Sequence, residues 1–219
     1  MVKPDGTGSL SAADSNAPLA DAAEKMDRSS IRILLEQRAD VNAPQTDGMT
    51  ALHWAAYQDD LETVELLVRS RANVKAANRY GVTPLSLACT NGNAAMVELL
   101  LKAGADPNTA LPGGETALMT AARTGKVEAV KTLLSQGADV NAKEGRQGQT
   151  ALMWAAAEGQ VEVVKELIKS GADFRTRLDS GFTPLMFAVR EGRIPVVKVL
   201  LEAGVDVNET VPAEAARRR

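Results

Sequence analysis

The chain contains one histidine and one cysteine, the side chains most often used for acid–base and nucleophilic chemistry near neutral pH. His53 could act as a general base only beside a positioned partner, and a single histidine excludes a zinc site that needs a histidine pair. Cys89 alone can form neither an internal disulfide nor a thiolate metal site, and nothing near it would lower the pKa of its thiol. The glycine-rich stretches 6–9 and 113–114 lack the lysine and the preceding strand of a phosphate-binding loop. We therefore expect no catalytic residue, no cofactor and no metal site.

The composition is typical of a folded protein with no dominant charge. Of its 219 residues, 45% are hydrophobic and 24% are charged, which excludes a disordered chain. Only 3% are aromatic, so Ala, Leu and Val must supply the core. The 25 basic and 28 acidic residues give a net charge of -3, which provides no overall attraction to nucleic acid or to an anionic membrane.

No segment of the sequence is apolar for long enough to span a bilayer. The longest apolar run, 151–157, has seven residues, whereas a membrane-spanning helix needs about 20. Residues 1–17 lack the apolar stretch of a signal peptide. We therefore predict a cytoplasmic protein, with a secreted or periplasmic location as the alternative if a leader precedes this chain.

The chain repeats one motif at a nearly constant interval. The motif Thr-(Ala/Pro)-Leu-x-x-Ala begins at Thr50, Thr83, Thr116, Thr150 and Thr183, so the steps along the chain are 33, 33, 34 and 33. A weakened copy begins one step before the first of these, at Ala17. A fixed interval of this length is typical of repeat proteins, in which each unit must be covered by its neighbours. The fold is therefore predicted to be a stack of about six such units.

Each unit predicts two helices and a loop. Threonine is a good helix N-cap, and in two units proline follows it at the first helical position. An aliphatic pair lies near the middle of each unit, as at Leu100 and Leu101, with another apolar residue shortly before it, as at Val97. Apolar residues at this spacing mark one face of a second helix, and a glycine such as Gly104 ends it. The Gly- and Asn-rich segment before the next threonine predicts a hairpin-like loop.

These residues resemble the ankyrin repeat family. Residues 50–55, Thr-Ala-Leu-His-Trp-Ala, match its first-helix motif, and residues 137–142, Gly-Ala-Asp-Val-Asn-Ala, match its repeat ending. The resemblance covers roughly residues 17–208. It implies an all-α solenoid of stacked antiparallel helix pairs with projecting β-turn or hairpin loops, and a concave surface made of the first helices and the loop tips. It also implies that His53 hydrogen-bonds neighbouring loops.

The repeat register divides the chain into a repeat domain and two flanking segments. Residues 1–16 and 209–219 are predicted to be flexible tails. The repeats between the tails are expected at 17–49, 50–82, 83–115, 116–149, 150–182 and 183–208.

Three positions depart from the glycines of the other units. Arg38 and Arg71 stand where later units carry Gly104 and its equivalents, and Asp59 stands where they carry Gly92 and its equivalents. If the backbone is left-handed at these positions, a residue other than glycine costs on the order of 1 kcal/mol there.

The resemblance implies that the chain is a scaffold for protein binding. A solenoid offers a long rigid surface whose exposed residues can vary without changing the packing. The geometry of the family places six of the seven aromatic residues on the concave surface, and aromatic residues are enriched in the cores of protein interfaces. The candidate partner-binding residues are Met49, Trp54, Tyr57, Gln58, Tyr80, Asn91, Arg123, Arg146, Trp154, Glu158, Phe182, Phe187 and Arg190.

Alternatives to this interpretation stay open at the level of sequence. Trp54, Trp154 and Phe187 could pack against the preceding repeat and seal the stack. Arginines in the groove, together with exposed rings, would suit single-stranded nucleic acid, and an accessory role in an enzyme complex is a further possibility. The acidic balance of charge favours a protein partner, so we predict a monomeric, non-catalytic protein-interaction module.

Overall fold

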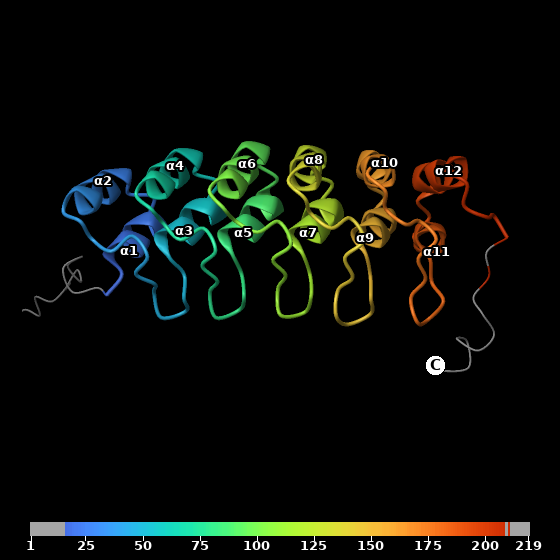
Figure 1. The fold of residues 1–219 in the computed structure, drawn as a ribbon, viewed down its shortest axis with the longest axis horizontal. Coiled ribbons are helices and arrows are strands. Elements are labelled where there is room, and N and C mark those ends of the chain that lie inside the picture. The colour runs from blue at the N-terminus through green and yellow to red at the C-terminus, as the bar shows by residue number, and fades with distance from the viewer. Residues whose placement is uncertain (1–15, 209, 211–219) are drawn as a thin grey trace, which may run out of the picture.

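Figure 1 shows the computed structural model, which describes residues 16–208 and 210. The part of the chain described consists of twelve helices in six consecutive pairs. The first helices of the pairs are α1 (Pro18–Glu24), α3 (Ala51–Tyr57), α5 (Pro84–Asn91), α7 (Ala117–Arg123), α9 (Ala151–Glu158) and α11 (Pro184–Arg190). The second helices are α2 (Arg28–Glu36), α4 (Leu61–Arg69), α6 (Ala94–Lys102), α8 (Val127–Ser135), α10 (Val161–Lys169) and α12 (Ile194–Glu202).

The predicted all-helical solenoid is confirmed. The predicted tails, 1–16 and 209–219, lie outside the described residues apart from Asn16 and Thr210. Five hairpin loops connect the repeats and project from the layer of first helices, on the side away from the second helices (Figure 1).

The threonines begin the first helices as the sequence predicted. The hydroxyl of Thr83 accepts a hydrogen bond from the backbone N–H of Ser86 at 3.2 Å, which satisfies one of the amide groups that a helix start leaves unpaired. The threonines that begin α7, α9 and α11 make the same bond with the residue three positions later. The glycines that follow α6, α8, α10 and α12 all have left-handed backbones, for example Gly104 with φ 99°.

The core lies between successive helix pairs and is built from small and branched residues. One position of the first helix is fully buried in each of the four repeats from the second to the fifth, where the residues are Ala56, Cys89, Ala122 and Ala156. The matching position of the second helix is also fully buried, and its residues are Val64, Val97, Val130 and Val164. Alanine, cysteine and valine are small enough for neighbouring helices to approach closely, which explains how a chain with few aromatic residues forms a continuous core.

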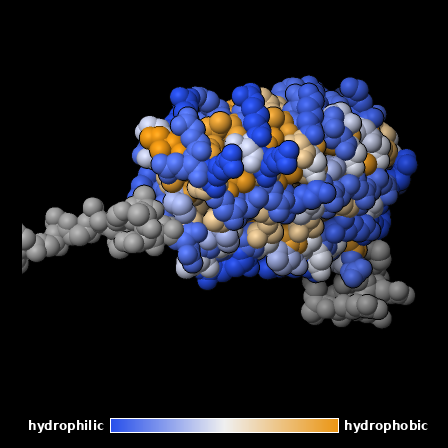
Figure 2. Space-filling view, turned by 60° about the vertical axis from the view of Figure 1, so that its left-hand side comes forward, coloured by the Kyte–Doolittle hydropathy of each residue, from blue (hydrophilic) through white to orange (hydrophobic). Residues whose placement is uncertain are grey.

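Both ends of the stack expose apolar side chains. Val189 occupies the position of the four buried small residues in the first helix but is 60% exposed, because the described chain has no further helix pair to cover it. Ile194 at the same end is 64% exposed. At the other end Met26 and Ile33 are 53% and 52% exposed, and Figure 2 shows hydrophobic residues grouped among hydrophilic ones on this side of the molecule.

Hydrogen bonds join neighbouring hairpins to one another. In the hairpin at 78–82 the backbone N–H of Asn78 donates to the carbonyl of Val82 at 3.0 Å. The N–H of Gly145 donates to the carbonyl of Gly113 in the preceding hairpin at 2.8 Å. A Cβ at Gly114 would lie 2.5 Å from the nitrogen of Gly145, so this close approach requires glycine. A similar bond, from the N–H of Arg79 to the carbonyl of Asp47 at 3.0 Å, joins the first two hairpins, so these backbone bonds link the expected hairpin-like loops in two pairs.

The repeat ending Gly-Ala-Asp-x-Asn forms a second series of hydrogen bonds. The Asp139 carboxylate accepts from the backbone N–H of Asn141, and the side-chain oxygen of Asn108 accepts from the N–H of Asp139 at 2.7 Å. Asn141 repeats this bond with Asp173 in the next repeat. These asparagines therefore hold each repeat ending against the following one.

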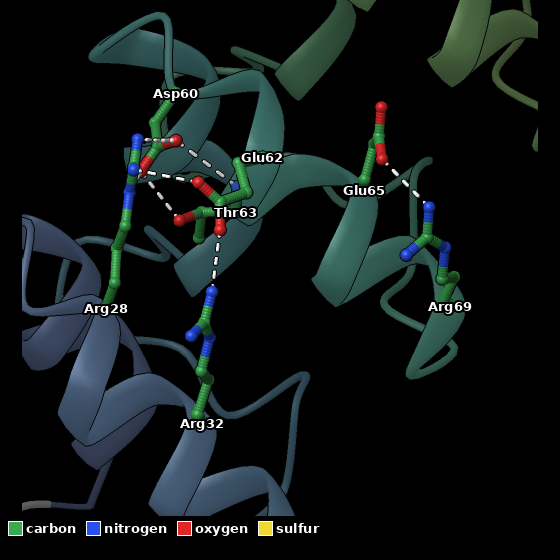
Figure 3. A network of polar contacts seen from close by, with 7 residues as sticks. All are labelled: Arg28, Arg32, Asp60, Glu62, Thr63, Glu65 and Arg69. Carbon is green, nitrogen blue, oxygen red and sulfur yellow. Dashed lines mark hydrogen bonds and ion pairs between the residues drawn. The ribbon is translucent and has the colours of Figure 1, made fainter.

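An ion-pair network connects the second helices of the first two repeats (Figure 3). Arg28 donates to both oxygens of Asp60, at 3.0 Å from Nε and 2.6 Å from Nη2. The same carboxylate caps α4 by accepting from Thr63, and its side chain is only 4% exposed. Arg28 and Arg32 also reach Glu62, but both partners there are about half exposed or more, so this part of the network contributes little stability.

The expected backbone strain occurs at all three positions that lack glycine. Arg38, Asp59 and Arg71 have left-handed backbones, with φ of 62°, 58° and 67°. A fourth residue, Met26, has φ 56° and was not anticipated, although it lies 33 residues before Asp59 and so at the same position of the repeat.

Replacing Arg71 with glycine should therefore stabilise the protein. Arg71 is exposed, and relief of its left-handed strain should contribute on the order of 1 kcal/mol and raise the melting temperature by about 2–4 °C. Differential scanning fluorimetry and circular dichroism check the temperature and the helix content.

The matched control is Gly137→Ala at the equivalent position of the fourth repeat. Gly137 has φ 90° and a Cβ there would meet nothing within 4 Å, so the change isolates the backbone cost and should lower the melting temperature. A lower melting temperature for Arg71→Gly would mean that Arg71 makes a contact worth more than its strain.

Candidate functional site

His53 is part of the scaffold. Its side chain is fully buried, and its Nδ1 accepts from the backbone N–H of Thr50 at 3.2 Å. This leaves Nε2 protonated, and Nε2 donates to the carbonyl of Val82 in the following hairpin at 3.0 Å. Burial lowers the pKa of His53, against the opposing effect of the Val82 carbonyl, so the ring is neutral at physiological pH. Both ring nitrogens therefore form hydrogen bonds within the scaffold, and the expected bond from His53 to a neighbouring loop is confirmed.

Cys89 is an inert core residue, as expected. Its side chain is fully buried between helix pairs. Burial raises the pKa of the thiol to about 12, so the nucleophilic thiolate is absent near neutral pH.

The open surface that carries most of the candidate residues is formed by the first helices and the hairpins, and is called the inner surface below. Tyr57 and Tyr80 are 59% and 63% exposed, the largest exposures of any aromatic side chain in residues 16–208. Trp54, Trp154 and Phe182 are half-buried. Six of the thirteen candidates are exposed on this surface: Tyr57, Tyr80, Arg123, Arg146, Glu158 and Arg190.

Two apolar candidates belong to the packed interior. Met49 and Phe187 are buried, at 8% and 5% exposure. For Phe187 the packing alternative is therefore correct, and neither side chain offers a partner much free surface.

Two amide candidates already have polar partners across a repeat boundary. The side-chain amide of Asn91 donates to the carbonyls of Ala56 and Tyr57 at the end of the preceding first helix. Gln58 donates in the same way to the carbonyl of Glu24. Both amides satisfy carbonyls that a helix end leaves unpaired, so they serve the stack.

Aromatic side chains on the inner surface are held by specific polar contacts. The indole N–H of Trp54 donates to Gln45 at 2.7 Å, and Tyr57 packs edge-on against the Trp54 ring with centroids 5.9 Å apart. The indole N–H of Trp154 donates to Gln149 at 2.7 Å. Both indoles also pack against the core, so they join the stack to the inner surface.

Arginines lie over the aromatic rings in the C-terminal half of the inner surface. The Arg123 guanidinium is 5.1 Å from the centroid of Trp154. The Arg190 guanidinium is 5.5 Å from the centroid of Phe182 and 5.0 Å from that of Phe187. At these distances the cation is attracted to the ring face, which fixes the position of each arginine.

A hollow of this surface, called the C-terminal cleft below, lies between the hairpins at 143–149 and 177–182. Its volume is about 840 Å³. Its charged lining residues are Lys143, Glu144, Arg146, Arg177, Asp179 and Arg190, and its aromatic lining residues are Phe182 and Phe187.

Glu144 organises one wall of the cleft. It is 7% exposed, and its carboxylate accepts from the backbone N–H groups of Arg146, Gln147 and Gln149 at 2.6, 2.7 and 3.1 Å. Burial would raise the pKa of Glu144, but these amide donors outweigh burial and lower it. The carboxylate is therefore ionised at neutral pH and occupied by its own hairpin.

The role of Glu144 was missed at the level of sequence, although a signal exists. The unit that begins at Thr116 is one residue longer than the others. Asn78 occupies the equivalent hairpin position in the repeat that begins at Thr50, where its short side chain accepts from the N–H groups of Tyr80 and Val82. The glutamate is longer by one methylene group, which lets it span the longer hairpin.

Residues 16–208 and 210 contain no candidate metal site and no candidate membrane-spanning helix. No group of three or more His, Cys, Asp or Glu side chains lies close enough together there to hold a metal ion. No helix in the same residues is both long and apolar enough to span a bilayer.

Comparison with known proteins identifies a family across most of the chain. A family model described as ankyrin repeats in three copies matches residues 19–111, 74–144 and 118–211. A comparison with curated protein sequences gave no match.

Replacing Glu144 with glutamine should destabilise the protein at neutral pH by about 1–3 kcal/mol, because a charge-assisted acceptor of three amide groups is lost. Since the folded pKa lies below the ordinary value of 4.5, the contribution of the ionised group is complete above that value. It is lost as the pH falls through the lowered pKa.

Urea unfolding of both proteins between pH 7 and pH 3 measures this effect. The difference between wild type and Glu144→Gln should shrink as the pH falls below about 4.5. A difference that stays constant over this range would exclude an ionised Glu144 as the source of the stability. Glu158→Gln, on an exposed side chain at the same end of the surface, is the control and should change stability by less than about 0.5 kcal/mol.

Proposed function

Because this chain belongs to the ankyrin repeat family, we propose that it is a non-catalytic module that binds another protein through its inner surface. Ankyrin repeats are generally protein–protein interaction modules, and the family is typically non-catalytic. The first helices and hairpin tips would supply the contacts, and the second helices would support them from behind. We also propose a monomer, and a cytoplasmic location stays a prediction.

The observation that carries this proposal is the exposure of Tyr57 and Tyr80. Each leaves more than half of its side chain uncovered although large rings are scarce in this chain. Exposed tyrosines at rigid positions lose little side-chain entropy when a partner covers them, which is why tyrosine is common at binding hot spots.

The variation along the inner surface supports the same conclusion. The position of Tyr57 is occupied in the following repeats by Thr90, Arg123, Ala157 and Arg190. A position that accepts such different side chains while the stack stays regular is not needed for packing. It is free to determine which partner is bound.

His53 and Cys89, the two residues whose chemistry is most often catalytic, give no support to a catalytic function. Both nitrogens of His53 are hydrogen-bonded within the scaffold, and Cys89 is a buried thiol with a raised pKa. An accessory role in an enzyme complex would still be a form of protein binding, so it is included in this proposal.

The binding of single-stranded nucleic acid is less well supported than protein binding. Stacking of bases needs open ring faces, whereas Arg123 and Arg190 lie over Trp154, Phe182 and Phe187. Arg123 is also paired with Glu115 at 3.5 Å. A steep dependence of binding on salt, measured with a labelled single strand, would favour nucleic acid instead.

The proposal predicts that Tyr57→Ala with Tyr80→Ala separates binding from folding. Because both rings are exposed, the free energy of unfolding should change by less than about 0.5 kcal/mol per site. Binding to a partner captured from the native lysate should weaken at least about tenfold, which corresponds to the loss of about 1.4 kcal/mol. Urea unfolding and quantitative pull-down measure the two effects.

Ile33→Ala is the matched control for this pair. Ile33 is also about half exposed but lies on α2, in the layer of second helices. It should change neither stability nor binding. Unfolding by the tyrosine pair would show that the inner surface has been assigned wrongly, and undiminished capture would place the binding site elsewhere on the chain.

A further inference from the structure

We propose that the C-terminal cleft binds an acidic segment of the partner protein, with an apolar side chain of that segment against its aromatic floor. This inference rests on the proposed function and gives a chemical identity to one part of the interaction. It follows from the charge of the cleft, from which of its charges are free, and from the position of its rings.

The cleft is more basic than the chain as a whole. Four cationic side chains line it, Lys143, Arg146, Arg177 and Arg190, against the carboxylates of Glu144 and Asp179. The whole chain has a net charge of -3, so the fold concentrates positive charge between these two hairpins. A basic hollow within an acidic protein attracts a negatively charged ligand and excludes cationic ones.

The charges that a ligand could reach in the cleft are more strongly positive than its lining residues alone suggest. The Glu144 carboxylate is occupied by backbone N–H groups of its own hairpin. By contrast, the side chains of Lys143 and Arg146 make no hydrogen bond or ion pair with any residue in 16–208, and Arg146 is exposed. The pKa of nearby Asp173 is lowered chiefly by the backbone N–H of Arg175 and least by the charge of Lys143. Two cations are therefore available to a ligand, whereas one of the two acids lining the cleft is not.

The other charged groups around the cleft leave this balance in place. Arg177 donates to the Gly181 carbonyl, so part of its guanidinium is used to hold the hairpin. Arg190 pairs with Glu191 through Nε at 2.8 Å, which leaves the two terminal nitrogens of its guanidinium outside that bond. Glu158 and Arg190 both line a smaller hollow that shares Phe187 with the cleft. Asp179 and Glu158 would therefore limit how many carboxylates the segment can place here.

The rings indicate that the bound segment is amphipathic rather than purely acidic. Phe182 is half-buried and packs edge-on against buried Phe187, with centroids 5.5 Å apart. Arg190 covers part of these rings, but Phe182 still lines the cleft. The cleft volume of about 840 Å³ lies within the range of small ligand sites and would hold a few residues of peptide.

The experiment selects peptides without assuming a sequence. A phage library of short random peptides is panned on the wild-type chain, and enriched peptides are synthesised with a fluorescent label for anisotropy. Two double variants are compared: Lys143→Glu with Arg146→Glu in the cleft, and Lys25→Glu with Lys75→Glu in the N-terminal half of the chain. The second variant has the same change of charge on exposed side chains outside the cleft. Circular dichroism and urea unfolding verify that both variants fold.

We expect the enriched peptides to be rich in Asp and Glu and to contain an aromatic or aliphatic residue. Their affinity should fall at least tenfold in the Lys143→Glu, Arg146→Glu variant and less than twofold in the control variant. Neutral or basic consensus peptides, equal loss of affinity in both variants, or no enrichment would each overturn the inference.

The result of the peptide experiment can be distinguished from the result of the tyrosine experiment that tests the proposed function. If the tyrosine pair abolishes capture of the partner while acidic peptides fail to bind, only the assignment of the cleft is wrong. If acidic peptides bind through Lys143 and Arg146 while the tyrosine pair has no effect, the protein binds partners through the cleft and not through the N-terminal hairpins.

Discussion

No helix pair in this chain can bury its own apolar face, and this constraint determines the rest of the structure. Cys89 lies on α5, which packs against α7, and is fully buried, whereas Val189 at the equivalent position of the last described pair is 60% exposed. Burying one valine side chain contributes about 1.5–3 kcal/mol, so each repeat gains stability only when the next one is in place. The small residues at this position keep the spacing of the helices uniform. The uniform spacing also allows hairpins, and the asparagines of the repeat endings, to form hydrogen bonds between neighbouring repeats.

This division of roles leaves the inner surface free to vary. The residues that hold the stack are alanines, leucines and valines between helices, together with capping threonines and left-handed glycines. Tyr57, Tyr80 and Arg146 belong to neither group. Different side chains at these positions give the two halves of the surface different characters. Near α3 and α5 the rings are exposed tyrosines, one of them beneath Arg79, whereas near α9 and α11 arginines lie over rings that are half-buried or buried.

Most of the scaffold could be predicted from the sequence because its determinants are local and periodic. The N-caps, the left-handed Arg38, Asp59 and Arg71, and the loop-bonded His53 all follow from their place in the repeat. The site was predicted less well, because its contacts cross repeat boundaries. The amide of Asn91 looks available in a single repeat, and only the position of α3 shows that it caps the preceding helix. Glu144 depends in the same way on the path of one longer hairpin.

The central claim is that the partner contacts the inner surface and leaves the second helices free. Hydrogen–deuterium exchange of the chain, alone and with its captured partner, tests this claim directly. The account predicts that added protection is confined to the hairpins and to the first helices α3, α5, α7, α9 and α11. Added protection confined to α4, α6, α8 and α10 would contradict it.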